Sequence, residues 1–513
     1  MRALACAPRE AQERVLRRIV RKARDTQFAR EHGLGAVRTL ADLARAVPLR
    51  DYAASQAWWT RARAGEPDVC WPGRIRYWAI TSGTTAGEKL MPVSADTIRT
   101  NRLGGFDALV PFLAQDPRDL FAGRLVFLGG CTALREEGPI VVGDNTGIMA
   151  RHVPRLLARR HAPSAAVRAI PGWEAKIARA ADELVDADVR MISGVPSWLV
   201  LFGEAVLERA RARGADAADL RSVWPKLALF VHGGVVFEPY ARRVRALFGE
   251  TLTCIDTYSA SEGGMLAVQD LPGDRGMLPL CDRGVVFEFV PLGELEELGK
   301  PGELGTASPR RVPLADVETG VDYAVVVTTD SGIFGYLLGD VVRFVSRAPL
   351  RLVFAGRVAH QLNAYGEHLS GAEIERAMAE VAQRSGATVV EFASTAAFPV
   401  AGDPLGGHLH FVEFEGTPPE PRAFARALDA AIAAGNEDYA THRSHGVREP
   451  VVLPVPRGTF YAWMRLRGKL GGQNKVPRVL NDELRGSLEA FLARGERDGR
   501  DRPRAQDARS IDA

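Results

Sequence analysis

The chain has 513 residues, and folded cores usually stop growing near ~250–300 residues, so two or more domains are expected. Hydrophobic residues make up 46% and charged residues 25%, which excludes collagen, coiled coil and disorder for most of the chain. There are 66 Lys and Arg against 63 Asp and Glu, a net charge of +3 that excludes a dedicated binder of nucleic acid or acidic lipid. Any phosphate site must therefore be local.

Residues 1–33 form a basic segment in which Val15, Ile19 and Val20 recur among charged residues. The segment has no uninterrupted apolar stretch, so it predicts neither a signal peptide nor a membrane span. An amphipathic helix docked on the protein is favoured over a helix lying on a membrane surface. The sequence thus predicts a cytoplasmic protein with no membrane partner and no nucleic-acid partner.

The cysteines are widely spaced, odd in number and form no CxxC pair. Such a set predicts reduced, mostly buried thiols in a cytoplasmic protein. They are Cys6, Cys70, Cys131, Cys254 and Cys281.

Between about residues 75 and 355, short β-branched runs alternate with helical stretches, which predicts an α/β architecture. Strands are expected within 124–130, 188–195, 226–234 and 321–330, and helices at 174–187 and 197–213. From 356 the pattern changes, with helices expected at 371–385 and near 420–434, and strands near 388–400 and 407–415. We expect an N-terminal domain at 1–355, a small α+β domain at 356–493 and a disordered charged tail at 494–513.

The stretch YWAITSGTTAGEKLMPVS (77–94) predicts a phosphate-binding loop after a strand. Its glycines permit close backbone approach, its hydroxyls and amides can contact phosphate oxygens, and Lys89 supplies positive charge. The Walker pattern GxxxxGK[ST] is absent. The alternative is a polar turn that leads from a strand to a helix.

A single carboxylate, Glu262, lies among hydroxyls in TYSASEGGMLAV (257–268), just after the expected strand TLTCID. Mg²⁺ keeps several waters and takes few protein ligands, so Glu262 is the metal candidate. The alternative is a solvated surface glutamate.

In GIFGYLLGDVVRFV (332–345), Asp340 follows Gly339 in an expected turn, where a carboxylate could bind both ribose hydroxyls. The alternative is an ordinary hairpin turn.

In FVHGGVVFEPY (230–240) a strand leads to Gly233 and Gly234, against which a flat adenine could stack. His232 by itself is more often a core histidine than a ligand. His408 and His410 have the spacing of one strand face, but no third ligand is near in sequence, which disfavours zinc.

The basic, Gly-rich stretch RLRGKLGGQNKVPRVL (465–480) offers Lys469 and Lys475 on a loop of the expected small domain. A cation on such a loop can be swung into a site and withdrawn. The alternative is a solvated basic loop.

The order of these motifs is more specific than any one of them. TSGTTAGEKLMP, GVPSWL, HGGVVFEPY, YSASEGG, YLLGD, GRVAHQLNAYGEHLSGAEIE and NKVPR follow one another in an order that resembles the adenylate-forming superfamily of acyl-CoA synthetases, peptide-synthetase adenylation domains and firefly luciferase. After the phosphate loop, Pro-Lys-Gly is missing and the motif ends in GEKLMP. These features resemble the Gretchen Hagen family of auxin-responsive acyl-acid amido synthetases, as do YLLGDVVRF and NEDY with GQNKVPR. The resemblance spans roughly residues 10 to 490.

The resemblance implies a large N-terminal adenylation domain of several subdomains, with β-sheets flanked by helices and a small distorted barrel, and a small mobile α+β C-terminal domain. It also implies a ligase that uses ATP and Mg²⁺ to activate a carboxylic acid as an acyl-adenylate and then forms an amide with an amino acid. Ligands of both steps are small molecules; the oligomeric state is open and a monomer is compatible with the sequence.

Motif by motif, the resemblance makes Glu262 the Mg²⁺-binding acid, Asp340 the ribose contact and Lys475 the lysine of the mobile domain, with Lys475 and Glu262 as the catalytic pair. The set expected to contact nucleotide is Ser82, Gly83, Thr84, Thr85, Lys89, His232, Gly233, Gly234, Tyr258, Ser261, Asp340 and Arg357. The phosphate loop departs from many relatives by having Ala86. The hinge departs from them by having Ala359 and His360, which leaves the switching residue of the hinge undefined.

Two other functions remain open from the sequence. One is an acyl-CoA or other thioester-forming ligase, and the other is a non-catalytic protein that binds an acyl or nucleotide ligand. No short motif identifies the acid or the amine. Candidate walls of the acid pocket, each more often ordinary core, are Leu128, Met149, Val195, Trp198 and Val235.

Overall fold

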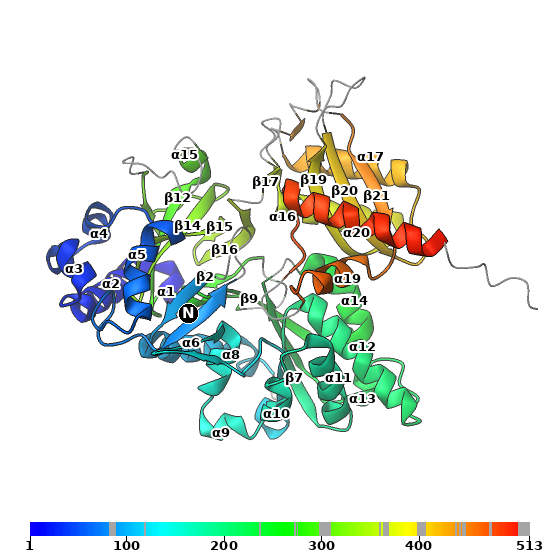
Figure 1. The fold of residues 1–513 in the computed structure, drawn as a ribbon, viewed down its shortest axis with the longest axis horizontal. Coiled ribbons are helices and arrows are strands. Elements are labelled where there is room, and N and C mark those ends of the chain that lie inside the picture. The colour runs from blue at the N-terminus through cyan, green and yellow to red at the C-terminus, as the bar shows by residue number, and fades with distance from the viewer. Residues whose placement is uncertain are drawn as a thin grey trace, which may run out of the picture. The chain divides into compact units, whose positions relative to one another are not determined.

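The computed structural model divides the chain into two compact units, Met1–Ala359 with Gly471–Asn474 and His360–Leu470 with Lys475–Ala513 (Figure 1). The structure describes residues 1–81, 89–116, 119–234, 237–270, 273, 275–296, 309–358, 361–362, 369–397, 407–436, 439–440, 443, 448–470 and 475–500. Each unit has its own sheets and its own hydrophobic core. The mixed α/β fold class predicted from the sequence is confirmed.

The first unit is built around a seven-stranded sheet in the order β11-β10-β9-β8-β7-β3-β6. The strands β6, β3, β7, β8 and β9 run parallel, and β10 returns antiparallel to β9. Their bounds are β3 Arg124–Phe127, β6 His161–Ala162, β7 Val189–Gly194, β8 Leu229–Gly233, β9 Thr253–Ala260, β10 Gly264–Val268 and β11 Leu278–Pro279. The expected strands near 124, 188 and 226 are confirmed.

Helices connect these strands, as parallel pairing requires. Those around the sheet are α9 Arg155–Ala158, α10 Ala165–Arg168, α11 Trp173–Leu184, α12 Pro196–Ala212, α13 Leu220–Val223 and α14 Glu238–Phe248, with the 3-10 helix Leu120–Ala122 before β3. The helices expected at 174–187 and 197–213 are α11 and α12. Pro196 begins α12, where its fixed φ suits the first helical turn.

A four-stranded sheet, β2-β1-β5-β4, contains the two strands on either side of the expected phosphate loop, whose residues 82–88 lie outside the described residues. It consists of β1 Tyr77–Thr81, β2 Lys89–Val93, β4 Arg135–Glu137 and β5 Ile140–Asp144. Strands β1 and β2 pair antiparallel, with Thr81 opposite Lys89, so a second strand follows the loop rather than a helix. Helix α6, Ala95–Asp107, begins only after β2, where the Ser94 side chain accepts from Asp96 N and Thr97 N. Nearby are α7 Val110–Leu113 and α8 Asn145–Arg151.

The third sheet is antiparallel, in the order β13-β12-β14-β15-β16. Its strands are β12 Val285–Pro291, β13 Val312–Pro313, β14 Asp322–Thr329, β15 Ile333–Arg347 and β16 Leu350–Arg357, with α15 Leu292–Glu296 after β12. The resemblance implied a small distorted barrel. Within the described residues β13 is an edge of this sheet, whereas Leu352 of β16 also forms an antiparallel bridge to Met277, next to β11, with backbone hydrogen bonds of 2.8 and 2.9 Å. Gly339 and Asp340 lie inside β15, so the turn expected at this pair is wrong.

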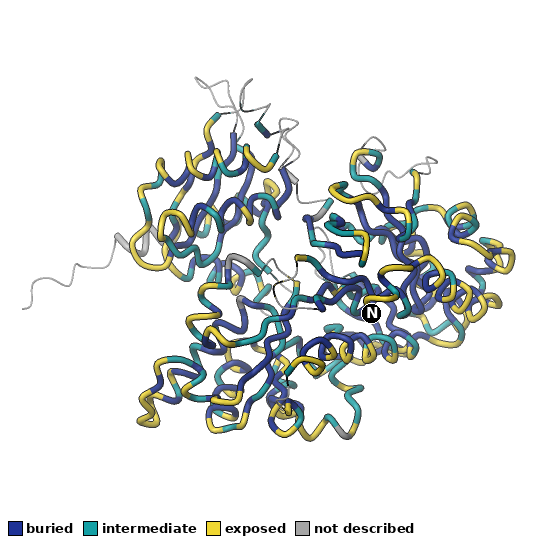
Figure 2. The backbone as a smooth tube through the Cα atoms, turned by 180° about the vertical axis from the view of Figure 1, so that it is seen from behind, coloured by how far each residue is buried: buried dark blue, intermediate teal, exposed yellow. Residues whose placement is uncertain are grey.

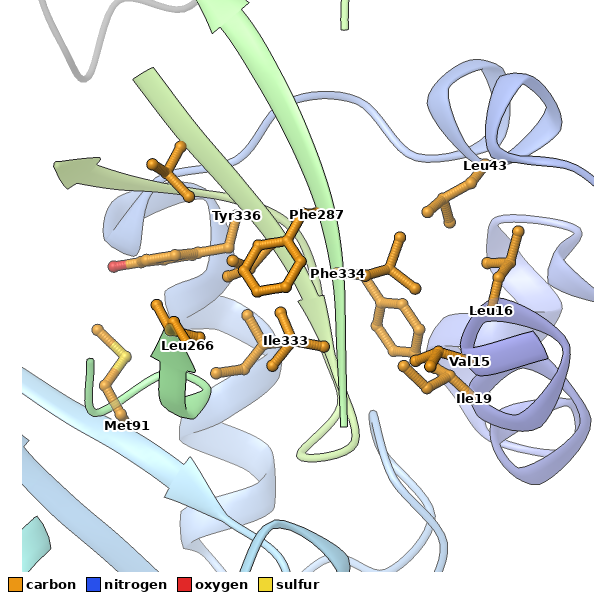
Figure 3. Packing of buried hydrophobic residues seen from close by; sticks show 14 of the residues in the cluster. Val15, Leu16, Ile19, Leu43, Met91, Leu266, Phe287, Ile333, Phe334 and Tyr336 are labelled. Atoms are coloured by element: carbon orange, nitrogen blue, oxygen red, sulfur yellow. The ribbon is translucent and has the colours of Figure 1, made fainter. Parts of the chain in front are cut away.

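The N-terminal helix α2, Pro8–Ala23, packs against this third sheet, which confirms the docked helix predicted from the sequence. Val15, Leu16 and Ile19 meet Phe334 in one buried cluster (Figure 3). The buried Gln12 side chain donates to Cys281 O at 2.8 Å and accepts from Phe287 N at 2.7 Å. Other helices here are α1 Arg2–Cys6, α3 Gln27–Glu31, α4 Leu40–Ala46, α5 Tyr52–Arg63 and the 3-10 helix Leu34–Ala36.

The second unit has a three-stranded sheet, β19-β20-β21, with a hydrophobic cluster on each face. Buried residues along the chain are dark blue in Figure 2. Val412 of β20 belongs to one cluster with α16 and α17, and Phe411 to the other with α19 and α20. The elements are β17 Gln361–Leu362, β18 Leu369–Ser370, α16 Gly371–Ser385, β19 Thr388–Ala397, β20 Gly407–Glu415, α17 Pro421–Gly435, β21 Val451–Val455, α19 Thr459–Leu466 and α20 Asp482–Arg500.

The helices and strands expected at 371–434 are confirmed. Helix α20 continues to Arg500, so the charged tail expected from 494 begins inside a helix; residues 501–513 lie outside the described residues.

All five cysteines are free thiols. Cys70 and Cys281 are buried, and burial raises the pKa of each thiol to about 12, which keeps both protonated. Cys6 is exposed, so the expectation of mostly buried thiols holds for only part of the set. Among the described residues, no helix combines the length and apolarity needed to cross a bilayer.

Candidate active site

Several of the predicted site residues gather at the carboxyl edge of the seven-stranded sheet. Gly234 follows β8, Glu262 follows β9, and Tyr258 lies near the end of β9. Open parallel sheets bind ligands outside the carboxyl ends of their strands. Tyr258 was expected just after a strand, but β9 extends to Ala260 and includes it.

Tyr258 and Asp340 connect this edge to the antiparallel sheet. The Tyr258 hydroxyl donates to Asp340 Oδ2 at 2.8 Å, and both residues are buried. Asp340 occupies an irregular position: the register of β14 with β15 shifts between Val341 and Leu337, and Gly339 has φ +79°. Asp340 therefore lies in a bulge of a continuous strand. The strand does not turn at this position, because the apolar runs on both sides of Asp340 pair with neighbouring strands.

Glu262 and Lys89 lie around one group of aromatic side chains. Burial and the negative charge of Glu262 raise the pKa of Tyr336. The Tyr336 ring lies 5.7 Å from the Trp59 ring, which in turn lies 5.5 Å from the Tyr52 ring. Lys89 Nζ lies 5.5 Å from the Tyr52 ring. The metal candidate and the phosphate-loop lysine thus belong to one neighbourhood, although they are far apart in sequence.

His232 is buried at the end of β8, with its ring stacked on Phe237 at 4.0 Å. Its Nδ1 lies 3.3 Å from Asp256 Oδ1, and its backbone oxygen accepts from Thr257 Oγ1 at 2.7 Å. These contacts fit the core histidine that was the alternative for this position.

The two glycines after His232 have structural reasons to be glycine. A Cβ on Gly233 would lie 2.3 Å from Thr257 O, so close packing of β8 on β9 requires glycine there. Gly234 has φ +85°, which also favours glycine. The backbone at the end of β8 is therefore bare of side chains at two successive positions.

Some predicted residues fall outside the description. Ser82, Gly83, Thr84 and Thr85 of the phosphate loop lie outside the described residues, as do Ala359, His360 and Val235. Ser261 is half-buried in the turn between β9 and β10. The backbone of Arg357 lies opposite Asp340 in the pairing of β16 with β15.

Lys475 belongs to the second unit, where it is half-buried. Its charge acts on Glu375, whose pKa is raised by burial and lowered in part by Arg478 and Lys475. Arg478 forms ion pairs with Glu375 and Glu391, and its backbone oxygen accepts from Ser394 N at 2.8 Å. The segment that follows Lys475 is therefore anchored in the unit, which disfavours the alternative of a wholly solvated loop.

The histidine pair of β20 has a structural explanation. His408 and His410 are both buried, and Ser394 Oγ lies 2.8 Å from His410 Nδ1. Burial lowers the pKa of His410 to about 3, so this ring stays neutral at physiological pH. Within the described part of the chain, no group of three or more metal-ligating side chains is present.

Three features of this region were missed by the sequence reasoning. Two of them are Tyr52, which lies near Lys89, and Tyr336, which lies near Glu262. These tyrosines are far apart in sequence, and no motif connects them. Lys176 is 3% exposed on α11, although lysine normally marks a solvated face. Its position three residues after Trp173, on the buried face of that helix, is a signal that the sequence did contain.

Three family models match the chain in order. They are the GH3 family N-terminal domain over residues 1–176, the GH3 family central domain over 278–357 and the GH3 family C-terminal domain over 372–484. The chain belongs to the GH3 family. This confirms the resemblance to the Gretchen Hagen family that the sequence motifs predicted.

Curated relatives from rice carry the same family name. The chain is 31% identical to "Probable indole-3-acetic acid-amido synthetase GH3.6" of Oryza sativa subsp. japonica over 44% of this chain and 46% of that protein. It is 29% identical to "Jasmonoyl--L-amino acid synthetase GH3.5" of the same organism over 51% of this chain and 47% of that protein. The chain thus spans about half the length of these two relatives.

Solved structures share the fold. The GH3.15 acyl acid amido synthetase superposes with a TM-score of 0.74 at 18% identity, over 94% of this chain and 93% of that chain. A 2-hydroxyisobutyryl-CoA ligase in its postadenylation state gives a TM-score of 0.57 at 16% identity, over 95% and 91%. At these identities the likeness establishes the fold alone.

Proposed function

We propose that this GH3-family chain is an ATP-dependent acyl-acid amido synthetase. In the first step a carboxylate oxygen of the acid attacks the α-phosphorus of ATP, the bond to the β-phosphate breaks, and acyl-adenylate and pyrophosphate form. In the second step the amine of an amino acid attacks the acyl carbon. The bond from that carbon to the adenylate oxygen breaks, AMP leaves, and the amine loses a proton as the amide forms.

The observation that carries this proposal is the buried Tyr258–Asp340 pair at the carboxyl edge of the sheet. A carboxylate held by a tyrosine hydroxyl is suited to binding ribose hydroxyls, as acidic residues do in other nucleotide sites. Gly233 and Gly234 would contact adenine through their backbone, and Lys89 with the preceding loop would contact the phosphates. His232 would support this segment from the core.

Charge stabilisation is the main chemical requirement of the first step. Displacement at phosphorus develops negative charge on the equatorial and leaving oxygens, so fixed donors and cations contribute more than an acid or base. Lys475 would supply one cation, and its placement in a separate compact unit is compatible with a residue that approaches for one step and leaves for the other.

Magnesium fits the residues at this position. Glu262 is a half-buried carboxylate in a turn, and Mg²⁺ uses one or two carboxylates together with waters and substrate phosphates. Glu262 would hold the ion, which would neutralise phosphate charge when bound.

The substrates are proposed by class. The names of the relatives refer to indole-3-acetic acid and jasmonoyl-amino acid synthesis, and GH3.15 has been determined in complex with 2,4-DB. We propose that the substrates of this chain are likewise a small carboxylic acid and an amino acid. A thioester-forming ligase is the second candidate, because the fold is shared with a CoA ligase.

Carboxylate-dependent ATP–pyrophosphate exchange tests the first step, with a broad panel of acids and with Mg²⁺. Glu262→Ala should abolish exchange, whereas Glu208→Ala, at a side chain 76% exposed, should leave it unchanged. Amino acids or CoA are then added, and the products are identified by mass spectrometry. An acyl-amino acid supports the proposal, a thioester supports the second candidate, and no exchange with any acid contradicts both.

A further inference from the structure

A group of buried donors lies at the same carboxyl edge, away from the Tyr258–Asp340 pair. Trp173 begins α11, Trp198 lies in the first turn of α12, and Gly129 follows β3. In the sheet order, β7 and β3 lie on the far side of β8 from β9. This group is therefore separate from the expected nucleotide contacts on β9 and β15.

Two indole N–H groups in this place have no hydrogen-bond partner among the residues that the structure describes. Trp173 Nε1 and Trp198 Nε1 are both buried and unpartnered, and their ring centroids lie 5.0 Å apart. Four other tryptophans donate normally: Trp71 to Asp96, Trp78 to Ile75 O, Trp224 to Leu184 O and Trp463 to Ser487. A buried donor without an acceptor is costly, so two in contact require an explanation.

Lys176 adds a buried positive charge to the group. It is 3% exposed, and its Nζ lies 5.9 Å from the Trp173 ring. Within the described part of the chain its hydrogen bond is a long contact of 3.4 Å to Gly129 O. Among the described residues no carboxylate forms an ion pair with it. Burial lowers the pKa of Lys176, and the charges of Cys131 and Asp144 act in the opposite direction from a distance. Buried charges are normally paired directly, so the ammonium form of Lys176 lacks the ion pair that buried charges usually have.

Two helix N-termini meet here as well. Helices α11 and α12 begin without a side-chain cap, at Gly172 and Val195. The contact between Trp173 and Trp198 brings these two ends together. Helix N-termini favour negative charge, so they act in the same direction as the ammonium and the indole donors.

We propose that Lys176, Trp173 and Trp198 form a binding subsite for a carboxylate of a substrate. The two indole N–H donors match the two acceptor oxygens of a carboxylate, and the single ammonium of Lys176 matches its one negative charge. The inference rests on the proposed function, in which two substrates could bring this group: the α-carboxylate of the amino-acid acceptor, or a second carboxylate on the acyl substrate.

The test compares Lys176→Met with wild type in the full chain. The acceptor arm measures amide synthesis with the best wild-type amino acid and with its α-carboxamide. The acyl arm measures ATP–pyrophosphate exchange with hexanoate and with adipate. Lys226→Met, at a side chain 62% exposed, is the control. We expect the KM of the amino acid to rise about tenfold or more, while exchange with a monocarboxylic acid stays within about twofold.

A selective rise in the KM of adipate would also support the subsite and would assign it to the acyl substrate. Equal effects on charged and neutral probes, or no effect, would overturn the proposal. If Lys176→Met does not fold, Trp198→Phe removes one donor and keeps an aromatic ring, and Lys176→Arg should restore part of the affinity. Absence of exchange in wild type would instead contradict the proposed function.

Discussion

Buried charges in two regions of the first unit differ in how they are paired. In the sheet that supports the site, Arg311 forms an ion pair with Glu288, and both side chains are 1% exposed. At the carboxyl edge, Lys176, Trp173 and Trp198 are also buried but lack such partners among the described residues. We assign the paired charges of Arg311 and Glu288 to the scaffold. We assign the Lys176 ammonium, which has no such ion pair among the described residues, to the proposed binding subsite together with its two neighbouring indole donors.

The largest expected effect is on the scaffold. Arg311→Met should lower the free energy of unfolding by roughly 3–5 kcal/mol, because Glu288 would be left buried and unpaired. Urea denaturation measures this change. Lys176→Met should lower the free energy of unfolding far less. An equal decrease in the two variants would contradict the distinction between the two regions.

Asp330 gives a prediction about pH. It is buried, accepts from Thr97 Oγ1 at 2.7 Å, and burial raises its pKa to about 6. The folded state therefore holds this proton when the unfolded state has lost it, and stability falls as pH rises from about 4 to about 6. The fall from this group is roughly 3 kcal/mol. Asp330→Asn should remove that part of the pH dependence in urea denaturation, and an unchanged profile would contradict it.

Lys475→Ala tests the proposed cation of the first step. Adenylation should slow by about 100-fold, because a preorganised positive charge is lost, while ATP binding stays nearly intact. Single-turnover pyrophosphate release and ATP titration measure the two effects. Lys469→Ala is the matched control, and an unchanged release rate for Lys475→Ala would remove this residue from the role.

Asp340→Asn should have the smallest of these effects. The KM for ATP should rise about tenfold, because a charge-assisted hydrogen bond to ribose becomes a neutral one. Asp322→Asn on the neighbouring strand is the control, and its carboxylate pairs with Arg343. A KM that does not change for Asp340→Asn would place the ribose elsewhere.

The sequence predicted most elements of both units, because buried β-branched runs and amphipathic helices have clear periods. It failed at Gly339–Asp340, where a pair typical of turns lies in a bulge that neighbouring strands on both sides hold in place. Lys176 was missed because a lysine on a helix is normally solvated, although its spacing from Trp173 put it on the apolar face. Contacts such as Tyr258 with Asp340 depend on how two sheets meet, which no local pattern encodes.

The most direct test of the proposed chemistry follows oxygen from the acid. An acid labelled with ¹⁸O in its carboxylate is supplied with ATP, Mg²⁺ and an amino acid, and the products are analysed by mass spectrometry. If the acid is activated as an acyl-adenylate, one labelled oxygen appears in AMP when the amide forms. Label in inorganic phosphate, or amide formation with unlabelled AMP, would contradict the account.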